Sequence, residues 1–271
     1  MSEDARSAII AGPASATSPA PTPLAPEPAM PPLAPDAFID RLRDEGARRY
    51  HDAHPFHRRM HDGSLSRAEL QRWVTNRYYY QTRIPIKDAL ILAKSEDPVF
   101  RRVWIHRLRD HDGETEGTGG LAMWLKLAEA VGLDAAEVAS CRQVLPGVRF
   151  ACDGYVSLVR ESALVVAVAS SLTEFFAPDL MSKRIDAWER HYPWVAAAGL
   201  SYFRARVTRA RHDSAEAVAF VVANANTRLL QEACIGALIR KTEVLWHLLD
   251  CVQAAGDAAG PARDAPGPEA T

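Results

Sequence analysis

The chain has 271 residues, of which 48% are hydrophobic, and its formal net charge at pH 7 is −2. This composition is typical of one large globular domain with tails, and the nearly balanced charge argues against a nucleic-acid partner or a membrane-surface partner. The N-terminal residues lack the apolar run of a signal peptide, and we expect no segment as apolar as the roughly 20 residues of a membrane span. A cytoplasmic protein is the resulting expectation.

Both ends of the chain are predicted to lack a packed core. Residues 1–35 contain nine of the eighteen prolines, mostly among alanine, serine and threonine, which predicts a disordered Pro/Ala-rich extension. Residues 254–271 repeat the bias toward alanine, glycine and proline, which predicts a flexible tail. The residues between them, 36–253, are predicted to form one helical domain.

The first strong helix signal follows Ser66. With Glu69 three residues later, Ser66 forms a capping box, which is typical of a helix N-terminus. Leu70, Trp73 and Val74 then recur at helical spacing. A helix is therefore predicted from this point onward.

A second helix is predicted to start at Pro98, with Asp97 as its cap, and to stop at Gly113. Further helical patterns cover residues 120–131, 146–160, 163–176, 199–211 and 214–252, the last with a break around 224–226. No segment alternates polar and apolar residues with the period of two that a half-buried strand requires. The predicted fold class is therefore all-α, a compact bundle of about seven or eight helices.

Polar side chains interrupt the apolar stripes of these helices. The stripe through Trp73 and Val74 continues, three and four residues at a time, onto Arg77, Tyr80 and Gln81. Inward positions on the other helices carry a further set of polar residues: Arg107, His111, Tyr155, Thr173, Glu174, Tyr202, Arg206 and Lys241. A single long cation at such a position usually pairs with an acid or extends to solvent, so it is the number of these residues that is informative.

The inward cations outnumber the inward acids. Glu174 is the clear acid on an apolar helix. The inward cations are Arg77, Lys87, Arg107, Arg206 and Lys241. One acid cannot balance them, and an unpaired buried charge costs several kcal/mol. We therefore predict a pocket for a ligand with several carboxylates or phosphates, held by arginine side chains and tyrosine hydroxyls.

His111 is the candidate acid or base, because imidazole titrates near neutral pH without a large shift and Arg107 lies one turn away on the same face. The alternative is a core histidine that is hydrogen-bonded to a carbonyl group. The histidines of YHDAHPFHRRMHDG suggest a metal site, but Pro55 interrupts any common helical face and no carboxylate pattern accompanies them. No metal site is therefore predicted.

Several sequence blocks are distinctive: NRYYYQTRIPIKDA, RDHDG, WLKLAEAVGL, VLPGVRFACDGYV, SSLTEFFAP and HYPW. These blocks closely resemble the pyrroloquinoline quinone (PQQ) synthase family, and the resemblance runs from about residue 36 to residue 251. It implies a heme-oxygenase-like bundle and a homodimer. The helical domain 36–253 is then the catalytic domain.

The resemblance also implies the reaction. Members of this family close the last ring of a small bicyclic quinone precursor that bears amino-acid carboxylates, and oxidise it to PQQ with release of hydrogen peroxide. They use dioxygen as co-substrate, without a metal or another cofactor. PQQ itself carries three carboxylates, which suits the cationic pocket predicted from the helix stripes.

Individual residues match family positions of known role. The residues that match positions of proton transfer and of the oxygen pocket are His111, Tyr202 and Arg206. Those that match substrate-binding positions are Tyr50, His51, Arg77, Tyr80, Gln81, Lys87, Arg107, Tyr155, Thr173, Glu174, Arg184 and Lys241. Met181 departs from the family pattern, which has a histidine there, and methionine cannot donate the corresponding hydrogen bond.

Two alternative functions stay open. One is a related oxidase, di-iron or metal-free, that acts on a different substrate, because this fold carries several chemistries. A di-iron site requires several Glu, Asp and His ligands on facing helices, whereas the inward positions here hold cations that would repel iron. The other is a non-catalytic carrier of a polycarboxylate, which would need the cationic pocket but not His111.

Overall fold

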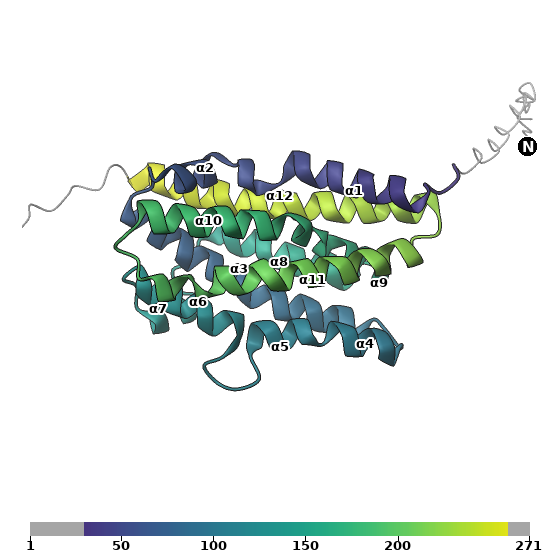
Figure 1. The fold of residues 1–271 in the computed structure, drawn as a ribbon, viewed down its shortest axis with the longest axis horizontal. Coiled ribbons are helices and arrows are strands. Elements are labelled where there is room, and N and C mark those ends of the chain that lie inside the picture. The colour runs from purple at the N-terminus through teal and green to yellow at the C-terminus, as the bar shows by residue number, and fades with distance from the viewer. Residues whose placement is uncertain (1–29, 260–271) are drawn as a thin grey trace, which may run out of the picture. The chain divides into compact units, whose positions relative to one another are not determined.

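The computed structural model describes residues 30–259, apart from the side chains of residues 211, 212 and 259 (Figure 1). The α-helices are α1 (Pro35–Arg49), α2 (Pro55–Asp62), α3 (Arg67–Ala93), α4 (Pro98–Trp104), α5 (His106–Asp112), α6 (Gly119–Ala130), α7 (Ala135–Ala139), α8 (Pro146–Glu161), α9 (Leu164–Ala169), α10 (Ala177–His191), α11 (Ser201–Asn224) and α12 (Arg228–Ala259). Three short 3-10 segments join them, η1 (His51–Ala53), η2 (Ser170–Phe176) and η3 (Ala197–Leu200). No strand occurs in residues 30–259, so the predicted all-α class is confirmed.

The helices are more numerous than the seven or eight that periodicity predicts. The pattern over residues 98–113 is divided at Ile105 into α4 and α5, and the pattern over residues 163–176 becomes α9 followed by η2. Short or strongly charged helices such as α1, α2, α7 and α10 add to the count. α1, for example, buries only Phe38, Leu42 and Gly46, which is too narrow a stripe to stand out in the sequence.

The predicted breaks near the C-terminus have mixed outcomes. The break around residues 224–226 is confirmed, because α11 ends at Asn224 and α12 begins at Arg228. The predicted gap at 212–213 is wrong, since α11 continues through it. α12 also extends to Ala259, into the predicted flexible tail, because its alanines are strong helix formers. The rest of that tail and almost all of the predicted extension lie outside the described residues.

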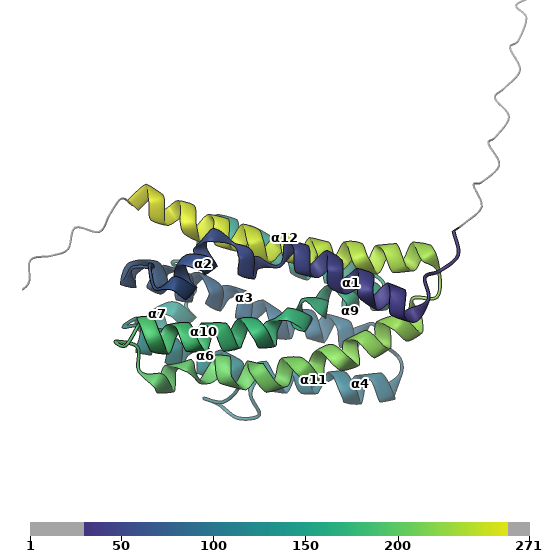
Figure 2. The same cartoon turned by 45° about the horizontal axis from the view of Figure 1, so that its top comes forward.

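α3 is the central helix of the bundle. It packs against α8, α5, α6 and α12, so it is covered on several sides. α1 lies along α12, and α10 lies along α11 (Figures 1 and 2). This enclosure explains why α3 buries polar side chains such as Asn76, Gln81 and Asp88 as well as its apolar ones. Every residue of α3 from Trp73 to Gln81 is buried, so this part of the helix has no solvent-facing side where polar groups would otherwise lie.

Local sequence signals start and stop the helices that carry the site. The capping box of α3 is confirmed, with the amide of Glu69 3.3 Å from Ser66 Oγ and the amide of Ser66 2.8 Å from Glu69 Oε2. Asp97 caps α4 by accepting from the Val99 amide at 2.8 Å. Gly113 ends α5 with a φ of 84°. These caps position α3 and α5, from which much of the site is built.

The hydrophobic core consists of two clusters of buried side chains. The aromatic centre of the first cluster contains Trp73, Trp124, Trp188 and Phe203. The second cluster contains Phe38, Trp104, Val168 and Leu172. Lys241 Nζ lies 4.1 Å from the ring centroid of Tyr80 in the first cluster and 3.4 Å from that of Tyr155 in the second. Polar residues therefore lie where the two clusters meet.

One segment, Leu164–His191, is apolar and long enough to meet the criteria for a membrane span, contrary to the sequence-based expectation. It forms α9, η2 and α10, and 61% of its most apolar window is buried inside the protein. Burial in the core accounts for its hydropathy, because core helices are as apolar as this segment. The segment therefore gives only weak evidence for a membrane association.

Gly119 allows the chain between α5 and α6 to approach itself closely. Its φ is +83°, and a Cβ there would lie 2.3 Å from the main-chain nitrogen of Gly113. Gly117 has a similar φ of +78°, but a Cβ there would meet nothing within 4 Å. Substitutions at these two glycines therefore allow the cost of backbone strain to be separated from the cost of steric overlap.

We expect Gly119→Ala to lower the free energy of unfolding by roughly 3 kcal/mol, because the methyl group would overlap main-chain atoms that cannot move independently. Gly117→Ala is the matched control and should cost only the strain of the left-handed conformation, about 1–2 kcal/mol. Urea unfolding of the parent and both variants measures the two losses. Equal losses would contradict the close approach of the chain at Gly119.

Candidate active site

Seven elements, namely α3, α5, α10, α11, α12, η1 and η2, contribute to one pocket with about 60 Å³ of free space. This volume is far below the roughly 300–1,000 Å³ that is usual for small-molecule sites, so the side chains of the pocket must move apart to admit a ligand of that size. The predicted site residues that line it are Tyr50, His51, Arg77, Tyr80, His111, Thr173, Glu174, Tyr202 and Arg206. The other lining residues are Ile84, Ala177, Met181 and Leu245. Residues that are far apart in the sequence thus share one cavity.

The remaining predicted residues lie behind this lining and are all buried. They are Gln81, Lys87, Arg107, Tyr155, Arg184 and Lys241. Gln81 Oε1 accepts a hydrogen bond of 2.8 Å from the hydroxyl of Tyr202, and Arg107 Nη1 donates one of 2.8 Å to Glu174 Oε2. These residues therefore hold the lining in place, and the sequence pattern alone does not separate them from it.

Carboxylates neutralise part of the buried positive charge, and the sequence analysis identified only Glu174 among them. Asp88 Oδ1 lies 2.7 Å from Lys87 Nζ, and Asp213 Oδ2 lies 3.3 Å from Arg206 Nη1. Asp88 did not stand out in the sequence because neighbouring residues on a helix point to different faces. Lys87 and Asp88 are both buried only because α3 is covered on several sides. The expectation that one acid faces five cations is therefore incomplete.

Three buried cations still have no carboxylate within 4.0 Å among residues 30–259: Arg77, Arg184 and Lys241. They pack against aromatic rings instead. Arg77 Cζ lies 4.0 Å from the centroid of Tyr80, and Arg184 Cζ lies 4.9 Å from that of Trp73. Such cation–π contacts offset up to about 2 kcal/mol each, which is less than the cost of burying a charge. This part of the wall therefore favours an anion.

Burial and mutual repulsion perturb these cations. Burial lowers the pKa of Lys241 well below its usual value, and the charge of Arg77 adds to the effect. The same two causes lower the pKa of Arg184 to about 9. A bound anion would act in the opposite direction and stabilise the protonated forms. Ligand binding and protonation are therefore coupled in this pocket.

His111 is held with one ring nitrogen available for chemistry. Its Nδ1 lies 3.2 Å from the carbonyl oxygen of Arg107, and because a carbonyl only accepts, Nδ1 carries the proton. Nε2 is buried and has no hydrogen-bond partner among the described residues. Burial and the charge of Arg206 lower the pKa of His111 to about 3, so the imidazole is neutral. The two interpretations of His111 given by the sequence therefore both apply. Its Nδ1 is bonded to a carbonyl group, as in a core histidine, and its Nε2 has no such partner in the described part of the chain, as in a candidate acid or base.

Tyr202 and Glu174 take opposite electrostatic roles beside Arg206. Burial raises the pKa of Tyr202, so its hydroxyl stays protonated and donates to Gln81. Burial alone would also raise the pKa of Glu174, but the neighbouring cations, Arg107 foremost, lower it to about 2. Glu174 is therefore ionised at neutral pH and pairs with Arg107 and Arg206.

Met181 lines the pocket at the position where the family pattern has a histidine. Its Sδ lies 3.9 Å from Nη1 of Arg184, so it offers this arginine only a weak acceptor. The other guanidinium nitrogen, Nη2, lies 3.2 Å from Nε2 of His57. Two neutral groups therefore contact Arg184, and neither neutralises it.

The histidine-rich stretch before α3 contacts other protein groups. The rings of His51 and His57 lie 4.9 Å apart, and those of His57 and His61 lie 6.0 Å apart. His54 Nε2 lies 3.0 Å from Asp250 Oδ1. Pro55 begins α2, so His51 and His54 precede the helix that carries His57 and His61, and the four share no helical face, as the sequence predicts. The absence of a metal site there stays a prediction.

The histidines of the site should make stability depend on pH. Burial lowers the pKa values of His51, His57 and His111, so below pH 6.5, the usual pKa of histidine, the unfolded chain binds more protons than the folded chain. The free energy of unfolding should then fall as the pH falls from about 6.5, by up to about 1.4 kcal/mol per pH unit for each histidine.

We expect His111→Gln to reduce this slope by about one histidine's contribution between roughly pH 6 and pH 4, because its folded-state pKa of about 3 is removed. Urea unfolding at a series of pH values measures the slope. Tyr202→Phe keeps every imidazole and should keep the parent slope. An unchanged slope in His111→Gln would contradict a neutral buried His111.

Comparison with known proteins identifies the family to which this chain belongs. Residues 39–251 match the TENA/THI-4/PQQC family. A pyrroloquinoline-quinone synthase from Rhizobium meliloti (strain 1021) is 51% identical over 219 residues, which cover 81% of this chain and 86% of that protein. A protein of the same name from Gluconobacter oxydans (strain 621H) is 47% identical over 218 residues, which cover 80% of this chain and 91% of the relative.

Solved structures show the same fold at low identity. A domain of unknown function with a heme oxygenase-like fold from Shewanella denitrificans OS217 has a TM-score of 0.68 at 14% identity, and the match covers 87% of this chain and 99% of that one. A TenA homologue from P. horikoshii OT3 has a TM-score of 0.65 at 13% identity, over 81% and 99% of the two chains. The predicted heme-oxygenase-like bundle is therefore confirmed, and the chain belongs to the TENA/THI-4/PQQC family.

Proposed function

We propose that this chain is a pyrroloquinoline-quinone synthase, an oxidoreductase that completes PQQ from a bicyclic quinone precursor with dioxygen as electron acceptor. The observation that carries the proposal is the set of buried cations without carboxylate partners, Arg77, Arg184 and Lys241, behind and beside one pocket. These cations occur in a chain that is 51% identical to a protein of that name. A substrate with several carboxylates supplies the negative charge that this wall favours.

The arginines and the lysine would interact with a carboxylate in different ways. The guanidinium group of Arg77, which lines the pocket, has a planar set of donors that matches a carboxylate, whereas Arg184 and Lys241 lie behind the lining and act through their charge. Arg77 and Lys241 both pack on the ring of Tyr80, so their positions are set before the substrate arrives. A preorganised cationic wall loses little side-chain entropy on binding, which favours affinity for a polycarboxylate.

His111 is the base of the proposed reaction. Its Nδ1 proton is held by the Arg107 carbonyl, so Nε2 is the nitrogen that takes a proton from the substrate. Burial, with the charges of Arg206 and Lys87, lowers its pKa to about 3, so it is a weak base in the resting protein. A substrate carboxylate bound beside it would favour the protonated imidazole and raise the pKa of His111 toward a useful range. The substrate thus activates the base that acts on it.

Arg206 and Tyr202 suit the oxygen chemistry. When a quinol is oxidised to a quinone, two electrons and two protons pass to dioxygen and form hydrogen peroxide, through anionic reduced-oxygen species. Arg206 and Tyr202 both line the pocket, and a buried guanidinium and a phenol there would stabilise such anions as they form. The proposed enzyme needs no resident metal or organic cofactor, because the substrate itself supplies the electrons.

The likeness to PQQ synthases also supports two proposals about the setting. The first is a homodimer, and the second is a cytoplasmic location, where the precursor and dioxygen are the reaction partners. Sedimentation analysis of the purified chain tests the first of these directly.

The test of the proposed function is oxygen uptake by chelator-treated protein that is supplied with the precursor. We expect oxygen consumption, hydrogen peroxide and the absorbance spectrum of PQQ. His111→Ala should lower kcat by about 10²–10⁴-fold, because it removes the base, while the affinity for the precursor is nearly kept. His191→Ala removes an exposed imidazole at the end of α10 and is the matched control.

The possible outcomes separate the alternatives. Precursor binding without oxygen uptake would contradict the synthase and leave a polycarboxylate carrier. Uptake that requires iron to be restored after chelation would favour a di-iron oxidase. Equal activity of His111→Ala and the parent would remove His111 from the reaction.

A further inference from the structure

Asp213 lies outside the pocket lining but contacts two arginines of the site. It follows Arg206 by seven residues on α11, so both side chains project from nearly the same face of that helix. Its Oδ2 lies 3.3 Å from Arg206 Nη1, and its main-chain oxygen accepts a hydrogen bond from Arg107 Nη2. The side chain of Asp213 is only 3% exposed, so water competes little for these contacts.

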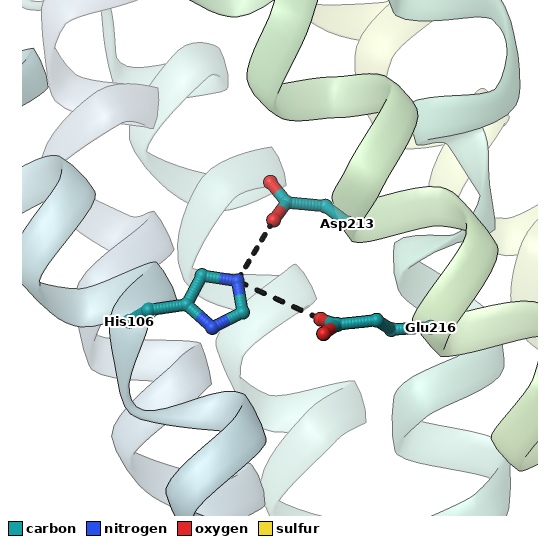
Figure 3. A group of neighbouring side chains, drawn as sticks. All are labelled: His106, Asp213 and Glu216. Atoms are coloured by element: carbon teal, nitrogen blue, oxygen red, sulfur yellow. Dashed lines mark hydrogen bonds and ion pairs between the residues drawn. The ribbon is translucent and has the colours of Figure 1, made fainter.

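The other carboxylate oxygen of Asp213 contacts residues nearer the surface. Its Oδ1 lies 3.1 Å from Nε2 of His106, the first residue of α5, and Glu216 Oε2 lies 3.6 Å from the same nitrogen (Figure 3). The side chains of His106 and Glu216 are 32% and 24% exposed. Asp213 thus connects a partly exposed group on α5 to the buried Arg206 on α11.

Among residues 30–259, one other carboxylate lies within 4.0 Å of Arg206, and that one is shared. Glu174 Oε1 lies 3.7 Å from Arg206 Nη2, whereas Glu174 Oε2 lies 2.8 Å from Arg107 Nη1. Asp213 is therefore the nearer acid for Arg206. Without its charge, a buried guanidinium would face a second arginine across a single shared carboxylate, and its orientation would no longer be fixed.

We propose that Asp213 is a positioning residue: its pair with Arg206 fixes the guanidinium against the pocket, where reduced oxygen forms in the reaction. The inference rests on the proposed function and extends it to a side chain that does not touch the substrate. An electrostatic group lowers a reaction barrier only if it is already oriented when charge develops. Asp213 supplies that orientation for Arg206.

A metal ion is the other occupant that these side chains could serve. One ligand atom from each of His106, Asp213 and Glu216 lies within 4.8 Å of the others, which is a spacing that suits a divalent cation. However, Asp213 already pairs with Arg206 and accepts from Arg107, so an added cation would lie beside two buried arginines. A positioning role for Asp213 requires no further positive charge beside these arginines. The observations therefore favour it over a metal site.

The kinetic test compares three variants in PQQ formation from the precursor. Asp213→Asn keeps the shape but removes the charge, so kcat should fall by about 10- to 100-fold while KM changes by less than about threefold. Asp213→Glu should recover part of the rate. Glu216→Gln is the matched control, because Glu216 contacts His106 while the carboxylates at Arg206 are Asp213 and Glu174, and it should stay within about twofold of the parent.

A double-mutant cycle tests whether Asp213 acts through Arg206. In an Arg206→Lys background, Asp213→Asn should have little further effect on kcat, because the guanidinium that it positions is gone. Full additivity of the two changes would overturn the inference. Parent-like kcat in Asp213→Asn would overturn it as well.

The orientation of Arg206 is also measurable without turnover. In nitrogen NMR spectra of the arginine side chains, with Arg206 assigned by Arg206→Lys, the parent should show separate Nη signals and Asp213→Asn should show averaged ones. If the parent forms no PQQ but this change occurs, the proposed function is wrong and the positioning of Arg206 by Asp213 stands. Averaged signals in the parent, or a zinc-dependent rate that Glu216→Gln abolishes, would overturn the positioning role.

Discussion

Burial of positive charge at the centre of the bundle is the constraint on which the rest of the structure depends. Arg77 on α3, Arg184 on α10 and Lys241 on α12 are buried without a carboxylate partner among residues 30–259. Replacing these cations by apolar residues of similar size would make the folded protein more stable. Aromatic rings offset part of the cost, and two packed core clusters keep the helices in place while the charges remain.

The cations of the site fall into two groups with different physical tasks. Lys87, Arg107 and Arg206 have carboxylate partners, which fix the shape of the wall. The unpaired cations lower the pKa of their neighbours and favour an anion. A polycarboxylate substrate would complete the charge balance and, in the same step, make His111 a stronger base. In the proposed reaction, substrate binding would therefore also activate the base.

Much of the fold and of the site is predictable from the sequence because both depend on helical periodicity. The stripe through Trp73 and Val74 leads to Arg77, and capping residues mark where α3 and α4 begin. Periodicity does not show which acid meets which cation. Asp88 adjoins its partner Lys87 in sequence, and its inward position depends on the burial of α3 on several sides.

Other features depend on contacts between distant segments and leave no local signal. Gln81 and Tyr202 are 121 residues apart, yet their side chains are joined by a hydrogen bond behind the pocket. The sequence likewise does not divide pocket-lining residues from those that support them, because both recur at the same helical spacing.

A comparison of PQQ with its trimethyl ester as ligands of the resting protein measures whether the pocket favours carboxylates. The two molecules share the ring system and differ in charge. We expect that PQQ raises the thermal unfolding midpoint in a concentration-dependent way and that the ester does not, with the shift by PQQ much reduced in Lys241→Met. Equal shifts by acid and ester, or none by either, would contradict this expectation.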